Sequence, residues 1–79
     1  MSQAREFAVT LAQQGDELDD WPTDGGAYEC LVGYQGKYYL VQFNEWGEAQ
    51  SYLNVEAEDM AEGHIADSIR EYEAKKVSA

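Results

Sequence analysis

Two runs of residues, 28–34 and 37–43, constrain the fold most strongly. In each run, aromatic and β-branched side chains occupy alternate positions, as in a strand with one buried face. Gln35 and Gly36 between the runs fit a tight hairpin turn, because glycine readily adopts a positive φ. A second turn at 44–48 is followed by a weaker strand at 49–53. The sequence therefore predicts a small antiparallel meander of three strands, one face of which needs a helix to be stable in water.

A first helix is predicted at residues 3–14, with Ser2 as its N-cap and Gly15 as its stop. Its apolar face consists of Phe7, Ala8, Leu11 and Ala12. A strand is the alternative for this segment, because Phe7, Val9 and Leu11 also alternate. Residues 16–26 follow as a long acidic loop, punctuated by aspartate, proline and glycine.

A second helix, of about twenty residues, is predicted from Asn54 as N-cap to the last turn at Lys75 and Lys76. Acidic residues in its first turn and lysines in its last turn complement the helix dipole. Its expected apolar stripe is Ala61, Ile65, Ile69 and Tyr72. Gly63 costs about 1 kcal/mol relative to alanine and predicts a kink or break there. The predicted fold is therefore a single α+β domain, residues 1–79, of order helix, three antiparallel strands, helix.

The negative charge of the chain is concentrated in its middle. Sixteen carboxylates against five lysines or arginines give a formal net charge of -11. The segments 1–15 and 63–79 each have a formal net charge of zero. The block 16–62 therefore carries the entire net negative charge, with Lys37 as its one base. Such a block repels nucleic acid and anionic lipid, which excludes direct binding to either. A basic protein partner is therefore expected.

The titratable side chains indicate no reaction chemistry. Cys30 lies within a predicted strand, where a buried thiol behaves as a small inert hydrophobe. His64 lacks the further nitrogen or sulfur donors that zinc needs. The acidic run 16–24 places Leu18 where an EF-hand has a ligand, which leaves weak unpatterned cation binding as the alternative. We predict no catalytic residues, no metal and no cofactor, and a protein that is not an enzyme.

Cysteine usage and the first residues predict a cytoplasmic protein. A lone cysteine cannot form an internal disulfide, which favours a reducing compartment. Residues 1–15 have no basic segment followed by an apolar run, and no stretch is long enough to span a bilayer. The protein is expected to be a monomer or a homodimer.

Aromatic residues lie among the acids and suggest a docking surface. A two-layer domain of this size cannot bury ten aromatic rings on one sheet face, and tryptophan and tyrosine often anchor interfaces. The alternative places the rings in the core and the charges on an ordinary solvated surface. The predicted partner-binding residues are Asp16, Glu17, Asp19, Asp20, Trp21, Asp24, Glu45, Trp46, Glu48, Glu56, Glu58, Asp59 and Glu62.

The size, the charge asymmetry, the acidic segments 16–24 and 56–62 and the predicted element order resemble a known class of proteins. This class is the small phage-encoded inhibitors of bacterial defence, the anti-CRISPR and antirestriction proteins, some of which are DNA mimics. These inhibitors share no common motif, so the resemblance is one of class. It implies a basic partner in the host cytoplasm, such as the DNA-binding or PAM-reading subunit of a CRISPR effector, whose lysines and arginines the carboxylates would occupy.

Three other functions remain open. An immunity or antitoxin protein would neutralise a basic nuclease through the same electrostatics. A domain from a halophile would use acidic, lysine-poor surfaces for solubility and need no such partner. A small enzyme would require a pocket with perturbed titratable groups.

Overall fold

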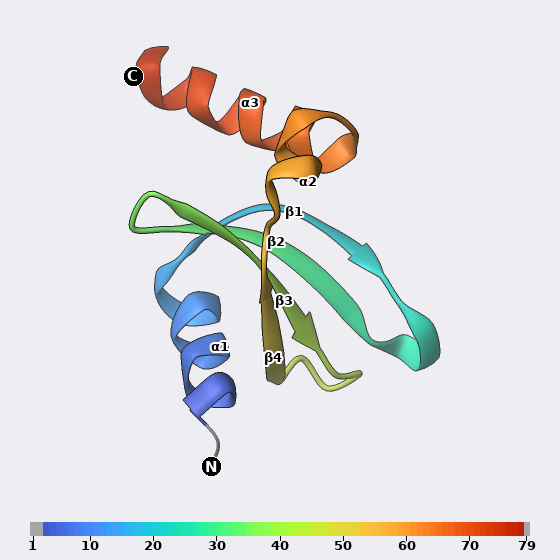
Figure 1. Cartoon of the computed structure of the whole chain (residues 1–79). Helices are drawn as coiled ribbons and strands as arrows, with labels where there is room; N and C mark the ends of the chain where they lie inside the picture. The colour runs from blue at the N-terminus through green and yellow to red at the C-terminus, as the bar shows by residue number, and fades with distance from the viewer. Residues whose placement is uncertain (1–2, 79) are drawn as a thin grey trace.

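The computed structural model describes residues 3–78, which form an α+β fold with helices on both sides of a sheet (Figure 1). The elements are α1 (Gln3–Gln14), β1 (Asp16–Pro22), a 3₁₀ turn (Asp24–Gly26), β2 (Tyr28–Tyr34), β3 (Lys37–Phe43), β4 (Ala49–Asn54), α2 (Ala57–Ala61) and α3 (His64–Ser78). Within residues 3–78 the strands form one antiparallel sheet in the order β1-β2-β3-β4. Helix α1 lies against one face, and α2 and α3 lie on the other side.

The sheet contains one strand more than the sequence predicted. Residues 16–22, expected as part of a loop, pair with β2 from Asp16, opposite Gly33, to Pro22, opposite Tyr28. The segment has few β-forming residues, and its alternation is interrupted because Leu18 is the extra residue of a β-bulge. An edge strand tolerates both the bulge and a terminal proline, and its charges protect the unpaired edge from other strands.

The predicted hairpin and first helix are confirmed. Gln35 and Gly36 both have positive φ, 51° and 80°, as a type I′ turn requires. Residues 3–14 form helix α1, so the strand alternative for this segment is wrong. The helix ends at Gly15, whose amide donates to the Leu11 carbonyl oxygen at 2.9 Å. Of its predicted apolar face, Ala12 is exposed. The predicted cap, Ser2, lies outside the described residues.

The main core lies between α1 and the sheet. Its buried members are Ala8, Leu11, Cys30, Val32, Tyr39, Val41 and Ala49. Phe7 packs edge-on against Tyr34, Tyr39 and Tyr52, with ring centroids 5.0 to 6.1 Å apart. These four of the ten aromatic rings therefore pack in or against this core.

A second apolar layer lies on the opposite face of the sheet. Leu31 of β2 is buried there, and α3 contributes the buried Ala66 and Ile69. Ile65 and Tyr72 are half-buried, whereas Ala61, also predicted in the stripe, is exposed. The single long helix was a wrong prediction, because the chain breaks at Gly63, which has φ 105°. Gly63 was the residue at which the sequence had predicted a break.

The start of this helical region also differs from the prediction. Asn54 ends β4 instead of capping a helix, and Glu56 precedes α2 without a side-chain capping hydrogen bond. The reason is the longer β4 ladder, since Asn54 pairs with Tyr39. No helix in the described part of the chain is long and apolar enough to cross a bilayer.

Candidate partner-binding surface

The β-bulge in β1 divides the four carboxylates of this strand between the two faces of the sheet. Glu17 and Asp20 lie opposite Val32 and Cys30 and share the face that α1 covers. Asp16 and Asp19 turn to the other face, where α3 packs. Without the extra residue at Leu18, the strict alternation of a strand would place Glu17 with Asp19 on one face and Asp16 with Asp20 on the other. The acids of segment 16–20 therefore do not form one flat surface.

Helix α3 docks on β1 through side chains spaced four residues apart. His64 packs edge-on against Trp21 with centroids 4.8 Å apart. Ser68 Oγ donates to Asp19 Oδ2 at 3.1 Å, and Tyr72 Oη donates to Asp16 Oδ2 at 2.7 Å. Residues at i and i+4 share one helical face, so a single stripe of α3 makes all three contacts with β1. This docking holds β1 in place.

Three predicted partner-binding residues therefore also contact the fold itself. Asp16 and Asp19 accept hydrogen bonds from α3, and the bond to Asp16 raises the pKa of the Tyr72 hydroxyl. Trp21 donates from Nε1 to Glu29 Oε1 at 3.0 Å and is half-buried. His64 was expected to be solvated; it is exposed but packs on Trp21. The sequence could not indicate this contact, because it joins segments more than forty residues apart.

On the other face, Glu17, Asp20 and Cys30 form a negative cluster. Their carboxylate oxygens and the thiol sulfur lie within 4.8 Å of one another, and Cys30 Sγ donates to Glu17 Oε1 at 3.1 Å. Burial, followed by the Glu17 hydrogen bond and the neighbouring carboxylates, raises the pKa of Cys30 to about 12. The thiol therefore stays protonated, which makes it a poor metal ligand and a poor nucleophile.

Acids also gather at the end of the sheet where β1 meets β2 and β3 meets β4. Asp24 lies in the 3₁₀ turn, and the Glu45 side chain packs beside Gly26 of that same turn. Glu48 follows in the turn before β4, and the Trp46 side chain between them is 76% exposed. The sequence-predicted residues Asp24, Glu45, Trp46 and Glu48 are thus placed together at one end of the molecule.

The turn that carries Trp46 is held by hydrogen bonds around Asn44. Asn44 Oδ1 accepts from the backbone amides of Trp46 at 3.1 Å and Glu48 at 2.9 Å. Asn44 Nδ2 donates to Glu48 Oε1 at 2.9 Å. An asparagine side chain that bonds its own following backbone stabilises a turn. The exposed indole is therefore displayed by an ordered segment.

The remaining predicted acids lie on and beside α2. Glu56, Glu58 and Glu62 are exposed, and Asp59 is half-buried. Helix α2 leads from the end of β4 to α3 (Figure 1). Glu56 and Asp59 border a cleft together with Leu40 and Asn54, and the Val55 amide beside them donates to the Tyr38 carbonyl oxygen. The α2 acids therefore begin beside the hairpin end of β4 and lie apart from the two turns that carry Asp24, Glu45 and Glu48.

Lysines occupy the opposite end. Lys37 lies in the β2–β3 hairpin, where it lines a small cleft together with Lys76 of α3. The Lys76 ammonium lies 5.1 Å from the centroid of the Tyr72 ring, and Lys75 precedes it in the last turn of α3. Lysines therefore gather at the hairpin end, where Asp16 and Glu73 also lie, whereas Asp24, Glu45 and Glu48 lie at the other end of the sheet, with Arg5 bordering Glu48.

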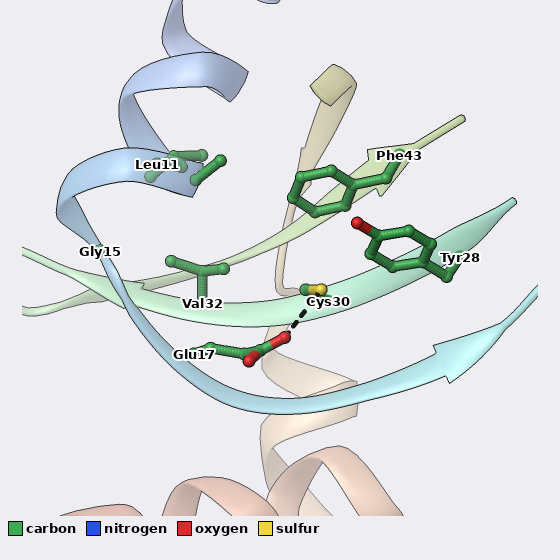
Figure 2. A pocket seen from close by; sticks show the side chains of 8 residues that line it. Leu11, Gly15, Glu17, Tyr28, Cys30, Val32 and Phe43 are labelled. Carbon is green, nitrogen blue, oxygen red and sulfur yellow. Dashed lines mark hydrogen bonds between the residues drawn. The ribbon is translucent and has the colours of Figure 1, made fainter. Parts of the chain in front are cut away.

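The sequence reasoning missed a cavity of about 170 Å³ beside the Glu17, Asp20 and Cys30 cluster (Figure 2). It lies under the C-terminal half of α1, with Leu11 above and Val32 and Cys30 below. Tyr28 and Phe43 stack at one side, with centroids 4.8 Å apart and planes 7° apart. Their pairing follows from the hairpin register and was therefore predictable, whereas the approach of Glu17 was not.

Comparison of the chain with protein-family models, with curated proteins and with solved structures gives no match.

Proposed function

We propose that this protein is an inhibitor of the anti-CRISPR or antirestriction kind, which acts in the host cytoplasm by occupying the lysine- and arginine-rich DNA-binding groove of its target. The observation that carries the proposal is the separation of charge. Asp24, Glu45 and Glu48 lie in the two turns at one end of the sheet, while Lys37, the base of block 16–62, lies at the opposite end. A basic groove that docks on the turn end therefore meets these carboxylates without Lys37 between them.

Four carboxylates within five residues give β1 a high charge density. Glu17 and Asp20 lie on the α1 face of this edge strand, and Asp16 and Asp19 lie on its α3 face. A cationic groove that closes around the edge strand therefore meets a pair of carboxylates on each face.

The rigidity of the acidic strand also supports the proposal. The sheet ladder to β2 and the contacts of His64, Ser68 and Tyr72 with β1 fix the backbone that carries the carboxylates. A fixed backbone reduces the ordering cost of binding, which a flexible acidic loop would have to meet. The exposed Trp46 adds an apolar contact at the turn end, and aromatic side chains often dominate binding energy.

The proposal is tested by competition with DNA. Purified CRISPR effector complexes and restriction endonucleases are titrated with the protein, and DNA binding is followed by fluorescence anisotropy. A target should lose DNA binding stoichiometrically, with an affinity that weakens steeply between 50 and 200 mM salt, as for a polyanion.

Charge-reversed variants locate the binding surface. Glu45→Lys with Glu48→Lys reverses two charges at the turn end and should weaken inhibition at least about tenfold. Glu48→Gln keeps an acceptor for Asn44 Nδ2 and shows whether loss of the turn's hydrogen bond contributes to that effect. Glu71→Lys, compared with Glu45→Lys alone, is the matched control, because it reverses one charge at an exposed position of α3. Equal inhibition by both folded variants, or capture of a target away from its DNA-binding groove, would refute the mechanism. Neutralisation of a basic nuclease alone would favour the immunity-protein alternative.

A further inference from the structure

We propose that the cavity between α1 and the strands β1 and β2 is an anchor pocket for one arginine side chain of the partner. The inference deepens the proposed function and rests on it for the identity of the partner. The pocket combines an apolar interior with carboxylates at one side. An arginine side chain complements both features, because its stem is apolar and its head is cationic.

The position of α1 creates the pocket. This helix packs mainly on β4, so the part of the sheet formed by β1 and β2 is left partly uncovered on the α1 face. The buried Leu11 and Val32 line the cavity from helix and sheet, and Tyr28 and Phe43 line one side of it (Figure 2). A volume of about 170 Å³ is below the roughly 300 Å³ at which sites for drug-sized ligands begin. A single side chain is therefore a better occupant than a cofactor.

The charge at the pocket selects a cation. Glu17 lies in the pocket wall with Oε1 against the Cys30 thiol, and a carboxylate oxygen of Asp20 lies within 4.8 Å of both groups. The Cys30 thiol donates to Glu17 Oε1, which leaves Glu17 Oε2 as an acceptor for a ligand. Two like charges at this separation repel each other, and a bound cation relieves that repulsion.

Arginine fits this pocket better than lysine does. A planar guanidinium donates two parallel hydrogen bonds to a carboxylate, stacks on aromatic rings and is less strongly hydrated than an ammonium. Glu17 offers the carboxylate, and the aromatic rings of Tyr28 and Phe43 line the same pocket. Arginine is also abundant among the side chains that proteins use to contact DNA phosphates.

The pocket is tested by nuclear magnetic resonance with a small probe and without the partner. The ¹⁵N-labelled protein is titrated with N-acetyl-arginine amide at constant ionic strength, with N-acetyl-citrulline amide as the neutral isostere and N-acetyl-lysine amide as the alternative cation. Arginine amide should bind with a dissociation constant on the order of millimolar and shift the amide signals of Gly15, Cys30 and Val32. Citrulline amide should leave them unchanged, and lysine amide should bind several-fold more weakly.

Two variants probe charge and space separately. Glu17→Gln removes the charge but keeps an acceptor for the Cys30 thiol, and should weaken arginine binding about tenfold. Ala12→Leu leaves all charges in place, sits at an exposed position of α1 and extends a side chain over the pocket that Ala12 lines. Glu45→Gln is the matched control, because it removes one charge at a site away from the pocket. Equal shifts with arginine and citrulline amides, or equal loss in the Glu45→Gln variant, would overturn the proposal.

The experiments can refute the anchor pocket and the proposed function independently of each other. If arginine amide does not bind and Ala12→Leu inhibits DNA binding as well as the wild type does, while the Glu45→Lys, Glu48→Lys variant does not, the pocket is refuted and the inhibitor function stands. If arginine amide binds as described but no DNA-binding protein is inhibited, the proposed function is refuted and the pocket stands.

Discussion

Two isoleucines on one helix offer a direct test of how α3 packs on the sheet. Ile69 is 4% exposed and lies with Leu31 and Ala66 in the second apolar layer. Ile65, one turn earlier, is half-buried. The sequence pattern treats the two as equivalent members of one stripe, whereas the docking of α3 on β1 makes Ile69 the central contact.

The expected cost of each truncation to alanine follows from this difference. Removing a fully buried isoleucine side chain costs about 2 to 5 kcal/mol, because contacts are lost and a cavity remains. We expect about 3 kcal/mol for Ile69→Ala and about half of that for Ile65→Ala, where solvent already reaches the side chain. A domain of this length has a total stability of roughly 4 to 12 kcal/mol, so Ile69→Ala removes a large share of it.

The measurement is urea unfolding followed by circular dichroism at 0.15 M salt. With a slope of about 1 kcal/mol per molar urea, Ile69→Ala should lower the midpoint by about 3 M and Ile65→Ala by about half as much. Ile69→Val, expected to cost about 0.5 to 1.5 kcal/mol, keeps the test decisive if the alanine variant does not fold. An Ile65→Ala variant that loses as much as Ile69→Ala, or more, would refute the packing of α3 described above.

Four further predictions concern the backbone, the reactivity of Cys30, the stability at high pH and the salt dependence. Gly15→Ala should destabilise the fold by at least about 2 kcal/mol in urea unfolding, because the added Cβ would lie 2.3 Å from Val32 Cγ1 and 2.7 Å from the Leu11 carbonyl oxygen; wild-type stability in this variant would contradict the tight junction of α1 and β1. At pH 8 the folded protein should react with a disulfide reagent about a thousandfold more slowly than a free cysteine, because burial raises the pKa of Cys30 from 9.0 to about 12 and so reduces the thiolate fraction. Burial also raises the pKa of Tyr38 from 10.0 to about 12, with help from its hydrogen bond to Glu73, so both groups favour the folded state only while protonated. Stability should therefore be complete below about pH 9 and fall as the pH rises toward 12, and a Cys30→Val variant should lose less over that range. The protein should be folded at 50 mM salt by circular dichroism, whereas unfolding there with recovery at molar salt would favour a halophile's domain over an inhibitor.

Much of the fold was predictable because local signals decide it. Alternating side chains and a turn with two positive φ values specify the β2–β3 hairpin and its register from residues adjacent in the chain. Helix α1 and the break at Gly63 follow from periodicity and from glycine chemistry in the same way. The charge imbalance was equally evident, since net charge is additive and does not depend on folding.

The strand β1, the docking of α3 and the anchor pocket depend on contacts between distant segments. Local propensity favours a loop at residues 16–22, but pairing with β2 and the contacts of His64, Ser68 and Tyr72 stabilise a bulged edge strand there. The bulge then decides which carboxylates face α3 and which face the pocket. The sequence therefore determined how much charge the protein carries and which short segments form a hairpin and helices, while tertiary packing alone decided where each charge lies, because long-range pairing energy outweighs the weak local preferences of an acidic segment.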